Sequence, residues 1–344
     1  MTNETQEPSP RLFLDTVNAY QRTAAITAAV ELDVFTAVGD SGASAEEVAQ
    51  RTGASVRGAR ILCDNLTLLG FLTKNGARYA LTPDSAMFLN RKSPAYAGDM
   101  TKFLLSSELI RGFAKLADAV RKGGTADTEL GTTAAEHPAW VEFARAMAPM
   151  MILGSQALAE MVSLDESRPS KVLDIAASHG MWGIAFAKRY PRASVVAVDW
   201  APVLKVARES AQRAGVADRY GTIAGNAFEV DLGSDYDAAL IPNFLHHFNK
   251  DDCVRFLKRV EAALRDDGRV AIAEFVPNPD RVSPPESAWF SLVMLATTPE
   301  GEAYTLPEFE EMLGQARFER PEVHSLPPVS TAIIAKKGKG KRKK

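Results

Sequence analysis

Short apolar segments alternate with helical segments from Lys171 onward, and this alternation restricts the possible folds more than any other feature. The expected strands are rich in β-branched residues, and most of them are followed by a segment with helical spacing. They are KVLDIA (171–176), ASVVAVD (193–199), YGTIAGN (220–226), YDAALIPN (236–243) and GRVAIAEFV (268–276), with a final antiparallel pair in RPEVHSLPP (320–328) and STAIIAKK (330–337). Such alternation predicts an α/β, Rossmann-like doubly wound sheet that is mostly parallel, with an antiparallel last strand.

The N-terminal part of the chain predicts a smaller, mostly helical domain. Residues 12–35 have helical spacing, and Ser44 with Glu47 has the pattern of a capping box before a short helix. A second helix is expected over residues 56–69, with an inner face made of Ile61, Leu62, Leu66 and Leu69. The dipeptide Asn75-Gly76 lies between two short strand-like segments, which is a strong hairpin signal. Helix, turn, helix and hairpin together predict a winged helix.

Two helical stretches, 99–122 and 134–163, lie between the winged helix and the first strand of the sheet, and Pro149 is expected to kink the second. The chain is therefore expected to divide into five parts. They are a disordered N-terminus (1–11), the winged-helix domain (12–98), a helical connector that contributes to the substrate pocket (99–165), the α/β domain (166–337) and a basic disordered tail (338–344).

Charge and cysteine content argue against several classes of function. Residues 336–344 carry seven of the 40 basic residues, so the remaining chain has 33 basic against 43 acidic residues, which argues against nucleic-acid binding. The two cysteines, Cys63 and Cys253, form no CxxC pair, and the polar N-terminus lacks the apolar core of a signal peptide. We therefore expect a reducing, cytoplasmic setting. No apolar stretch reaches 18 residues, so no membrane span is expected.

A loop of small residues after the first strand of the α/β domain is the strongest sign of a ligand. Its sequence is SHGMWG (178–183), and Asp199 ends the next strand. In such sheets ligands bind at the carboxyl ends of the strands, and an acidic residue there suits ribose hydroxyls. Asp174, at the end of the first strand, would repel a pyrophosphate but suits a ligand with an ammonium group. This combination favours S-adenosylmethionine over a dinucleotide.

These motifs resemble those of the caffeic-acid-type small-molecule O-methyltransferases, bacterial branch, a family of class I S-adenosylmethionine-dependent enzymes. The resemblance covers about residues 12–337, and it implies a homodimer formed through a winged helix that does not bind DNA. The family's first motif has an acidic residue and alternating glycines, whereas this chain keeps only the last glycine. The cofactor contacts that the resemblance implies are Asp174, Ala176, Ser178, Gly180, Asp199, Trp200, Asn226, Ala227, Phe228 and Asn243.

The segment after the fourth strand carries the expected catalytic chemistry. His246 falls on the family's catalytic histidine, and His247 replaces the aspartate that usually follows it. Glu274 matches a family carboxylate that orients the histidine. A neutral imidazole can accept the proton of a hydroxyl as that hydroxyl attacks a methyl group. We therefore expect His246 to be the base and Glu274 to support it, while His247 has either a catalytic or a structural role.

Two further points concern this expected catalytic site. The family's second carboxylate falls on Ala303, which leaves open whether the adjacent Glu302 replaces it. A metal ion is not expected, because the sequence places no third ligand near the histidine pair.

Apolar side chains that flank the expected catalytic site define a substrate pocket. They are Phe143, Met147, Met150, Met151, Trp289, Phe290 and Met294. Methionine-rich walls adapt to flat, bulky ligands, so the expected substrate is an aromatic or polyketide-like small molecule. Two alternatives remain, namely a relative that methylates nitrogen or carbon or catalyses a non-methylating reaction, and a DNA-binding regulator that uses the winged helix.

Overall fold

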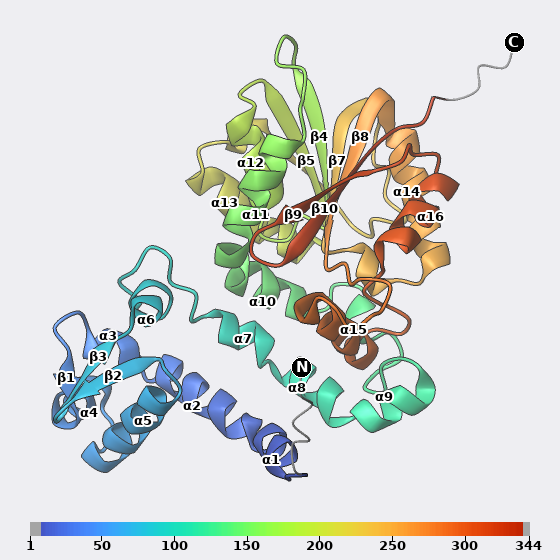
Figure 1. Cartoon of the computed structure of the whole chain (residues 1–344). Helices are drawn as coiled ribbons and strands as arrows, with labels where there is room; N and C mark the ends of the chain where they lie inside the picture. The colour runs from blue at the N-terminus through green and yellow to red at the C-terminus, as the bar shows by residue number, and fades with distance from the viewer. Residues whose placement is uncertain (1–7, 340–344) are drawn as a thin grey trace, which may run out of the picture. The chain divides into compact units, whose positions relative to one another are not determined.

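The computed structural model describes residues 8–339 and divides into two compact units, with the boundary between Thr101 and Lys102 (Figure 1). The expected disordered ends fall largely outside the described residues, because residues 1–7 and 340–344 are not part of them. The finer five-part division stays a prediction. Within residues 8–339, we find no helix that is long and apolar enough to cross a membrane.

The N-terminal unit contains six helices and one small sheet in its described residues. They are α1 (Arg11–Val17), α2 (Ala19–Glu31), α3 (Val34–Val38), β1 (Ala43–Ser44), α4 (Ala45–Thr52), α5 (Val56–Leu68), β2 (Leu72–Asn75), β3 (Arg78–Leu81) and α6 (Pro83–Phe88). The sheet has the antiparallel order β1-β3-β2. Helices α4 and α5 followed by the β2-β3 hairpin form the predicted winged helix.

Local sequence explains most of the boundaries in this unit. The capping box is present, since the side chain of Ser44 accepts from Glu47 N and Glu47 accepts from Ser44 N. The predicted single helix over residues 12–35 is wrong, because the chain breaks at Asn18 and again at Asp33, which has a left-handed φ of 55°. The predicted inner face of α5 is also partly wrong. Ile61 is exposed, and the buried residues are Ala59, Cys63 and Leu66, which follow helical spacing on one side of the helix.

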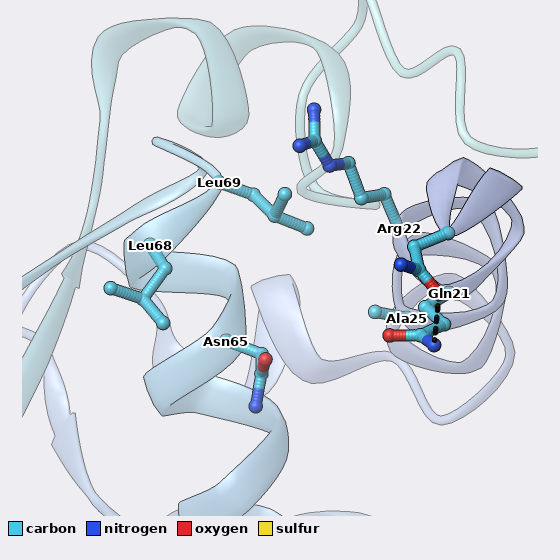
Figure 2. A pocket seen from close by; sticks show the side chains of 7 residues that line it. Gln21, Arg22, Ala25, Asn65, Leu68 and Leu69 are labelled. Carbon is cyan, nitrogen blue, oxygen red and sulfur yellow. Dashed lines mark hydrogen bonds between the residues drawn. The ribbon is translucent and has the colours of Figure 1, made fainter. Parts of the chain in front are cut away.

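An open groove of about 470 Å³ lies between α2 and α5 of this unit (Figure 2). Its lining combines polar side chains with leucines, and consists of Asn18, Gln21, Arg22, Ala25, Asn65, Leu68 and Leu69. Large apolar side chains on α1, α2 and α5 are exposed in this unit, among them Phe13, Val17, Tyr20 and Leu68.

The C-terminal unit starts with helices and continues as a seven-stranded sheet. The helices before the sheet are α7 (Met100–Leu104), whose first two residues belong to the other unit, α8 (Ser107–Ala114), α9 (Leu116–Lys122), α10 (Ala139–Ala146) and α11 (Ala148–Met161). The two predicted helical stretches are thus five shorter helices. Pro149 does not kink a continuous helix. It stands in the first turn of α11, where the missing N–H has no partner to lose.

The sheet has the order β6-β5-β4-β7-β8-β10-β9, and β10 runs antiparallel to both its neighbours, as predicted. Its strands are β4 (Ser170–Ile175), β5 (Ala193–Asp199), β6 (Tyr220–Ala224), β7 (Tyr236–Pro242), β8 (Leu264–Glu274), β9 (Glu322–Leu326) and β10 (Ser330–Lys336). The helices of this part are α12 (Met181–Arg189), α13 (Ala201–Arg213), α14 (Lys250–Ala263), α15 (Pro285–Thr297) and α16 (Leu306–Gln315).

Two apolar clusters hold helices against the two faces of this sheet (Figure 1). One cluster joins α11, α12 and α13 to the strands, and the other joins α14 and α16 to them. The parallel neighbours of β4 are β5 on one side and β7 on the other, so the order of the strands reverses at β4. At such a reversal, the carboxyl ends of the strands form the crevice in which these sheets bind ligands.

Candidate active site

The loop between β4 and α12 keeps the backbone of an alternating-glycine motif although two glycines are replaced. Ala176, Ser178 and Gly180 all have left-handed φ angles, of 50°, 52° and 79°. A side chain at Gly180 would meet the Tyr220 hydroxyl at 2.9 Å, so this position needs glycine for space as well as for conformation. The amide of Ser178 donates to the Asp199 carboxylate at 2.8 Å, which ties the loop to the end of β5.

Asp174 lies beneath this loop and supports it from below. The side chain is fully buried, and its Oδ2 accepts from the amide of Gly183 in the first turn of α12 at 2.9 Å. Burial raises the pKa of Asp174 to about 8. The reason given for Asp174 from sequence, a charged carboxylate that faces an ammonium group, therefore needs correction. The side chain reaches no surface of the protein, and its burial favours the uncharged form of the carboxyl group.

The other expected cofactor residues lie around the carboxyl ends of β5 and β6. Asp199 is only partly buried and accepts two backbone N–H groups, from Ser178 and Trp200. Trp200 precedes α13 and packs against an apolar cluster with α10. Asn226 caps the amide of Phe228, and Ala227 beside it is buried. Phe228 joins the aromatic side chains of residues 244, 248 and 256, so much of its ring belongs to the core.

A buried carboxylate holds His246 in two ways. Glu274, at the end of β8, is fully buried, and its Oε2 lies 2.5 Å from Nδ1 of His246. Its Oε1 accepts the amides of Phe244 at 3.0 Å, of Leu245 at 2.9 Å and of His246 at 3.4 Å. One side chain thus fixes both the short 3-10 turn Leu245–His247 and the imidazole on it. Because Nδ1 faces a carboxylate, its proton stays there, and Nε2 is left with a free lone pair.

Aromatic rings continue from this pair in both directions. Phe290 of α15 lies edge-on to His246, with 4.7 Å between ring centroids, and stacks on Phe275. On the other side, His247 lies 4.3 Å from His246 and 5.1 Å from Trp140 of α10. The series continues from Trp140 to Phe143 and to His179 in the loop between β4 and α12. The rings form a wall from the end of β8 to the loop after β4.

Burial favours the uncharged form of two histidines in this wall. Burial lowers the pKa of His179 to about 4, and its Nδ1 accepts the amide of Met181 at 3.1 Å. Burial, together with the charge that His246 can carry, holds the pKa of His247 well below its ordinary value.

The expected substrate-pocket residues divide into two groups. Phe143 and Phe290 are in the aromatic wall, and Met151 contacts the amide of Asn243 through its sulfur at 3.8 Å. Met147 and Met294 are buried, and Met150 is partly buried. Trp289, in contrast, is 69% exposed, because it points away from the buried side of α15. Its place in the expected substrate pocket stays a prediction.

The loop after α15 gives two further facts about the histidine pair. Glu302 is in an ion pair with Arg281 at 2.6 Å and is about half exposed, so it does not replace the carboxylate that Ala303 lacks. The loop also packs directly on the backbone of the pair. Any side chain at Gly301 would collide with the carbonyl oxygen of His246 and with Thr298.

Sequence reasoning missed Trp140 and Phe275. Trp140 is spaced at i and i+3 with Phe143 on α10, and this helical spacing was the available signal. Within the described part of the chain, no group of three or more His, Cys, Asp or Glu side chains could hold a metal ion.

The residues present fit S-adenosylmethionine. The loop with left-handed residues between β4 and α12 leaves its backbone accessible to a ligand. Asp199 retains lone pairs that can accept hydrogen bonds from ribose hydroxyls. Asn243 has a buried Oδ1 without a hydrogen-bond partner among the described residues. A doubly wound sheet with this loop, an acidic residue after β5 and a histidine–carboxylate pair after β7 and β8 defines the class of S-adenosylmethionine-dependent methyltransferases.

Comparison with known families gives the particular group within this class. Residues 113–319 match the O-methyltransferase domain, and residues 14–91 match the O-methyltransferase dimerisation domain. The chain belongs to the O-methyltransferase family, and it is an enzyme that depends on S-adenosylmethionine.

Individual relatives agree with this assignment. The 3-hydroxy-5-methyl-1-naphthoate 3-O-methyltransferase of Streptomyces sahachiroi is 29% identical over 316 residues, which cover 89% of each chain. The tetracenomycin polyketide synthesis 8-O-methyl transferase of Streptomyces glaucescens is 26% identical, over 98% of this chain and 99% of its own. A crystal structure of a candidate O-methyltransferase from Nostoc punctiforme superposes with a TM-score of 0.93 at 53% identity, over 96% of this chain and 100% of its own.

Proposed function

We propose that the enzyme methylates a hydroxyl group on an aromatic or polyketide-like small molecule, with His246 as the general base. The observation that carries this proposal is that Glu274 binds both the imidazole of His246 and the backbone of the turn that carries this imidazole. A carboxylate that binds Nδ1 keeps the proton on that nitrogen, so Nε2 is available to accept one from the substrate. The same carboxylate fixes the turn that carries the ring, so the base is already positioned before substrate binds.

The cofactor would be held by Asp199, Asn226, Asn243 and the loop of Ala176, Ser178 and Gly180, with Trp200, Ala227 and Phe228 around them and Asp174 as support beneath. When bound, it supplies an electrophilic methyl group on a sulfonium ion. His246 takes the proton of the attacking hydroxyl, a contribution on the order of 10²–10⁴-fold in rate. The remaining task of the protein is alignment, which can supply up to about 7–11 kcal/mol.

The series of aromatic rings, most of which meet edge to face, supports an aromatic acceptor. Trp140, Phe143 and Phe290 offer planar surfaces beside the two histidines, and the side chains of Met147, Met150, Met151 and Met294 would complete an adaptable pocket. The acceptors named for the two Streptomyces relatives, a hydroxynaphthoate and a tetracenomycin polyketide, belong to this chemical class. Methylation of nitrogen or carbon, and regulation through DNA binding, have no comparable support.

His246→Ala tests the proposal. We expect turnover of neutral phenols to fall by on the order of 10²–10⁴-fold, while calorimetry shows unchanged binding of S-adenosylhomocysteine. His324→Ala provides a matched control, because His324 lies half-exposed on β9 outside the site. Full turnover by His246→Ala on a neutral phenol at pH 7 would show that the base is assigned wrongly.

We also infer that two copies of the chain associate through the N-terminal unit. The match of residues 14–91 to a dimerisation domain supports this inference. So do the exposed apolar side chains of Phe13 and Val17 on α1 and of Leu68, which lines the α2–α5 groove (Figure 2). Leu68→Asp should shift the protein toward monomer in light scattering at micromolar concentration, whereas Gln50→Asp on α4 should leave the dimer intact. A wild-type protein that is monomeric at this concentration contradicts the inference.

A further inference from the structure

His247 has an unusual environment for a residue next to a catalytic base. Its Nδ1 is enclosed by the protein and has no hydrogen-bond partner among residues 8–339. Nε2 of the same ring is not among the enclosed atoms without a partner, and the residue as a whole is partly exposed. The ring is held between His246 and Trp140, with centroid distances of 4.3 and 5.1 Å.

The enclosed nitrogen determines which tautomer His247 adopts. A buried N–H without an acceptor costs more than a buried lone pair without a donor, so the proton avoids Nδ1. It is therefore on Nε2, the ring nitrogen that is not enclosed. Burial also holds the pKa of His247 well below its ordinary value, which favours the uncharged ring. His247 thus offers one fixed N–H donor beside the base.

We propose that His247 is a substrate-recognition residue whose Nε2–H donates to an acceptor oxygen next to the hydroxyl that His246 deprotonates. This inference rests on the proposed function and narrows its substrate class. The preferred acceptor is a hydroxyarene that carries a carbonyl oxygen ortho or peri to the reacting hydroxyl. The two rings are close enough to serve two neighbouring oxygens of one flat molecule.

The chemistry of such a substrate explains why an uncharged donor suits this position. The hydroxyl proton passes to Nε2 of His246. The oxygen forms its new bond to the methyl carbon as the bond from that carbon to the sulfur of S-adenosylmethionine breaks, and S-adenosylhomocysteine would be the leaving group. While the proton leaves, negative charge spreads from the phenol oxygen into a conjugated carbonyl oxygen. A preorganised N–H at that oxygen stabilises the charge where it develops, whereas a carboxylate in the same place would repel it.

A pair of bicyclic phenols tests this proposal. 8-Hydroxy-1-tetralone has a carbonyl peri to its hydroxyl, and 5,6,7,8-tetrahydro-1-naphthol has the same skeleton without that carbonyl. The measured quantity is the ratio of their kcat/KM values, which does not depend on the fraction of active enzyme. His247→Phe keeps a ring against Trp140 but removes the donor. His247→Gln keeps an N–H near the position of Nε2.

We expect His247→Phe to lower the ratio by about 10- to 100-fold, as for a lost hydrogen bond to a charged acceptor. His247→Gln should retain most of the wild-type ratio of kcat/KM values, and His324→Phe on β9 should leave this ratio unchanged. S-adenosylhomocysteine binding by calorimetry establishes that each variant is folded.

Three results would overturn the proposal. One is a ratio that His247→Phe leaves unchanged. The second is loss of the ratio in both variants alike, which indicates a packing role. The third is a stronger preference for a neighbouring hydroxyl without a carbonyl, which indicates the opposite tautomer. In all three cases the wild type still methylates phenols, and the proposed function stands. If the wild type binds S-adenosylhomocysteine but methylates neither compound nor any other hydroxyarene of a wider panel, the proposed function fails and this inference fails with it.

Discussion

Replacement of Glu274 by glutamine separates the orientation of the proposed base, His246, from its presence. The amide has the size of the carboxylate but only one oxygen. Two firm backbone hydrogen bonds, from Phe244 at 3.0 Å and Leu245 at 2.9 Å, compete for that oxygen with the single ring nitrogen of His246. The oxygen should therefore stay with the backbone, so the NH₂ group faces Nδ1.

This arrangement reverses the tautomer of His246. Nδ1 must now accept a hydrogen bond, so the ring proton moves to Nε2, and the nitrogen that faces the substrate can no longer accept a proton. Glu274→Gln should therefore lose the whole contribution of general base catalysis, on the order of 10²–10⁴-fold in kcat, although His246 is still present.

Three measurements check this reasoning. Turnover of a neutral phenol at pH 7 should fall in Glu274→Gln, while Glu319→Gln, an exposed control, should retain wild-type turnover. A nitrophenol that is already ionised should be methylated at nearly the wild-type rate, because it needs no base. The double variant Glu274→Gln/His246→Ala should be no slower than His246→Ala alone, since both changes remove one function. If Glu274→Gln keeps more than about a tenth of wild-type turnover on the neutral phenol, the tautomer argument is wrong.

Three further predictions concern the loops around the site. Asp174 holds a proton up to about pH 8 when folded but only to about pH 4 when unfolded. As pH rises between these values, wild type should therefore lose stability relative to Asp174→Asn, by up to about 1.4 kcal/mol per pH unit. Urea unfolding of both proteins at pH 5 and pH 7 measures this, and an equal difference in unfolding free energy at the two pH values would contradict it. Ala176→Gly should stabilise the protein by about 0.5–1 kcal/mol, because relief of a left-handed alanine exceeds the added chain entropy; an unchanged or lower urea midpoint would count against it. Gly301→Ala should displace the backbone of His246 and lower kcat by about 10²-fold with intact S-adenosylhomocysteine binding, and a wild-type kcat would exclude such coupling.

The sequence predicted those parts of the fold that depend on local pattern. Strand and helix periodicities located the seven strands of the large sheet, and the dipeptide Asn75-Gly76 located the hairpin. The approach of His246 to Glu274 was also predictable, because both residues follow adjacent strands, β7 and β8, at the same edge of the sheet.

Features that depend on contacts distant in sequence were not predictable in this way. The ion pair of Glu302 with Arg281 spans a loop whose path no periodicity specifies. The packing of Trp140 on His247 joins residues more than a hundred positions apart. The exposure of Trp289 depends on which face of α15 is covered, and α15 is apolar on several sides.

The contact of Gly301 with the histidine turn affects how such an enzyme can acquire a new substrate. Helix α15 carries Phe290 of the proposed pocket wall, and the loop that follows the helix packs without spare room on the backbone of His246. A chimera that received only α15 and its following loop from a relative would combine them with the histidine turn of this protein. That loop would be adapted to the histidine turn of the relative, so the two would not fit together. Residues 243–301 should therefore be exchanged as one block, and natural changes of substrate should recombine at the ends of this block rather than within it.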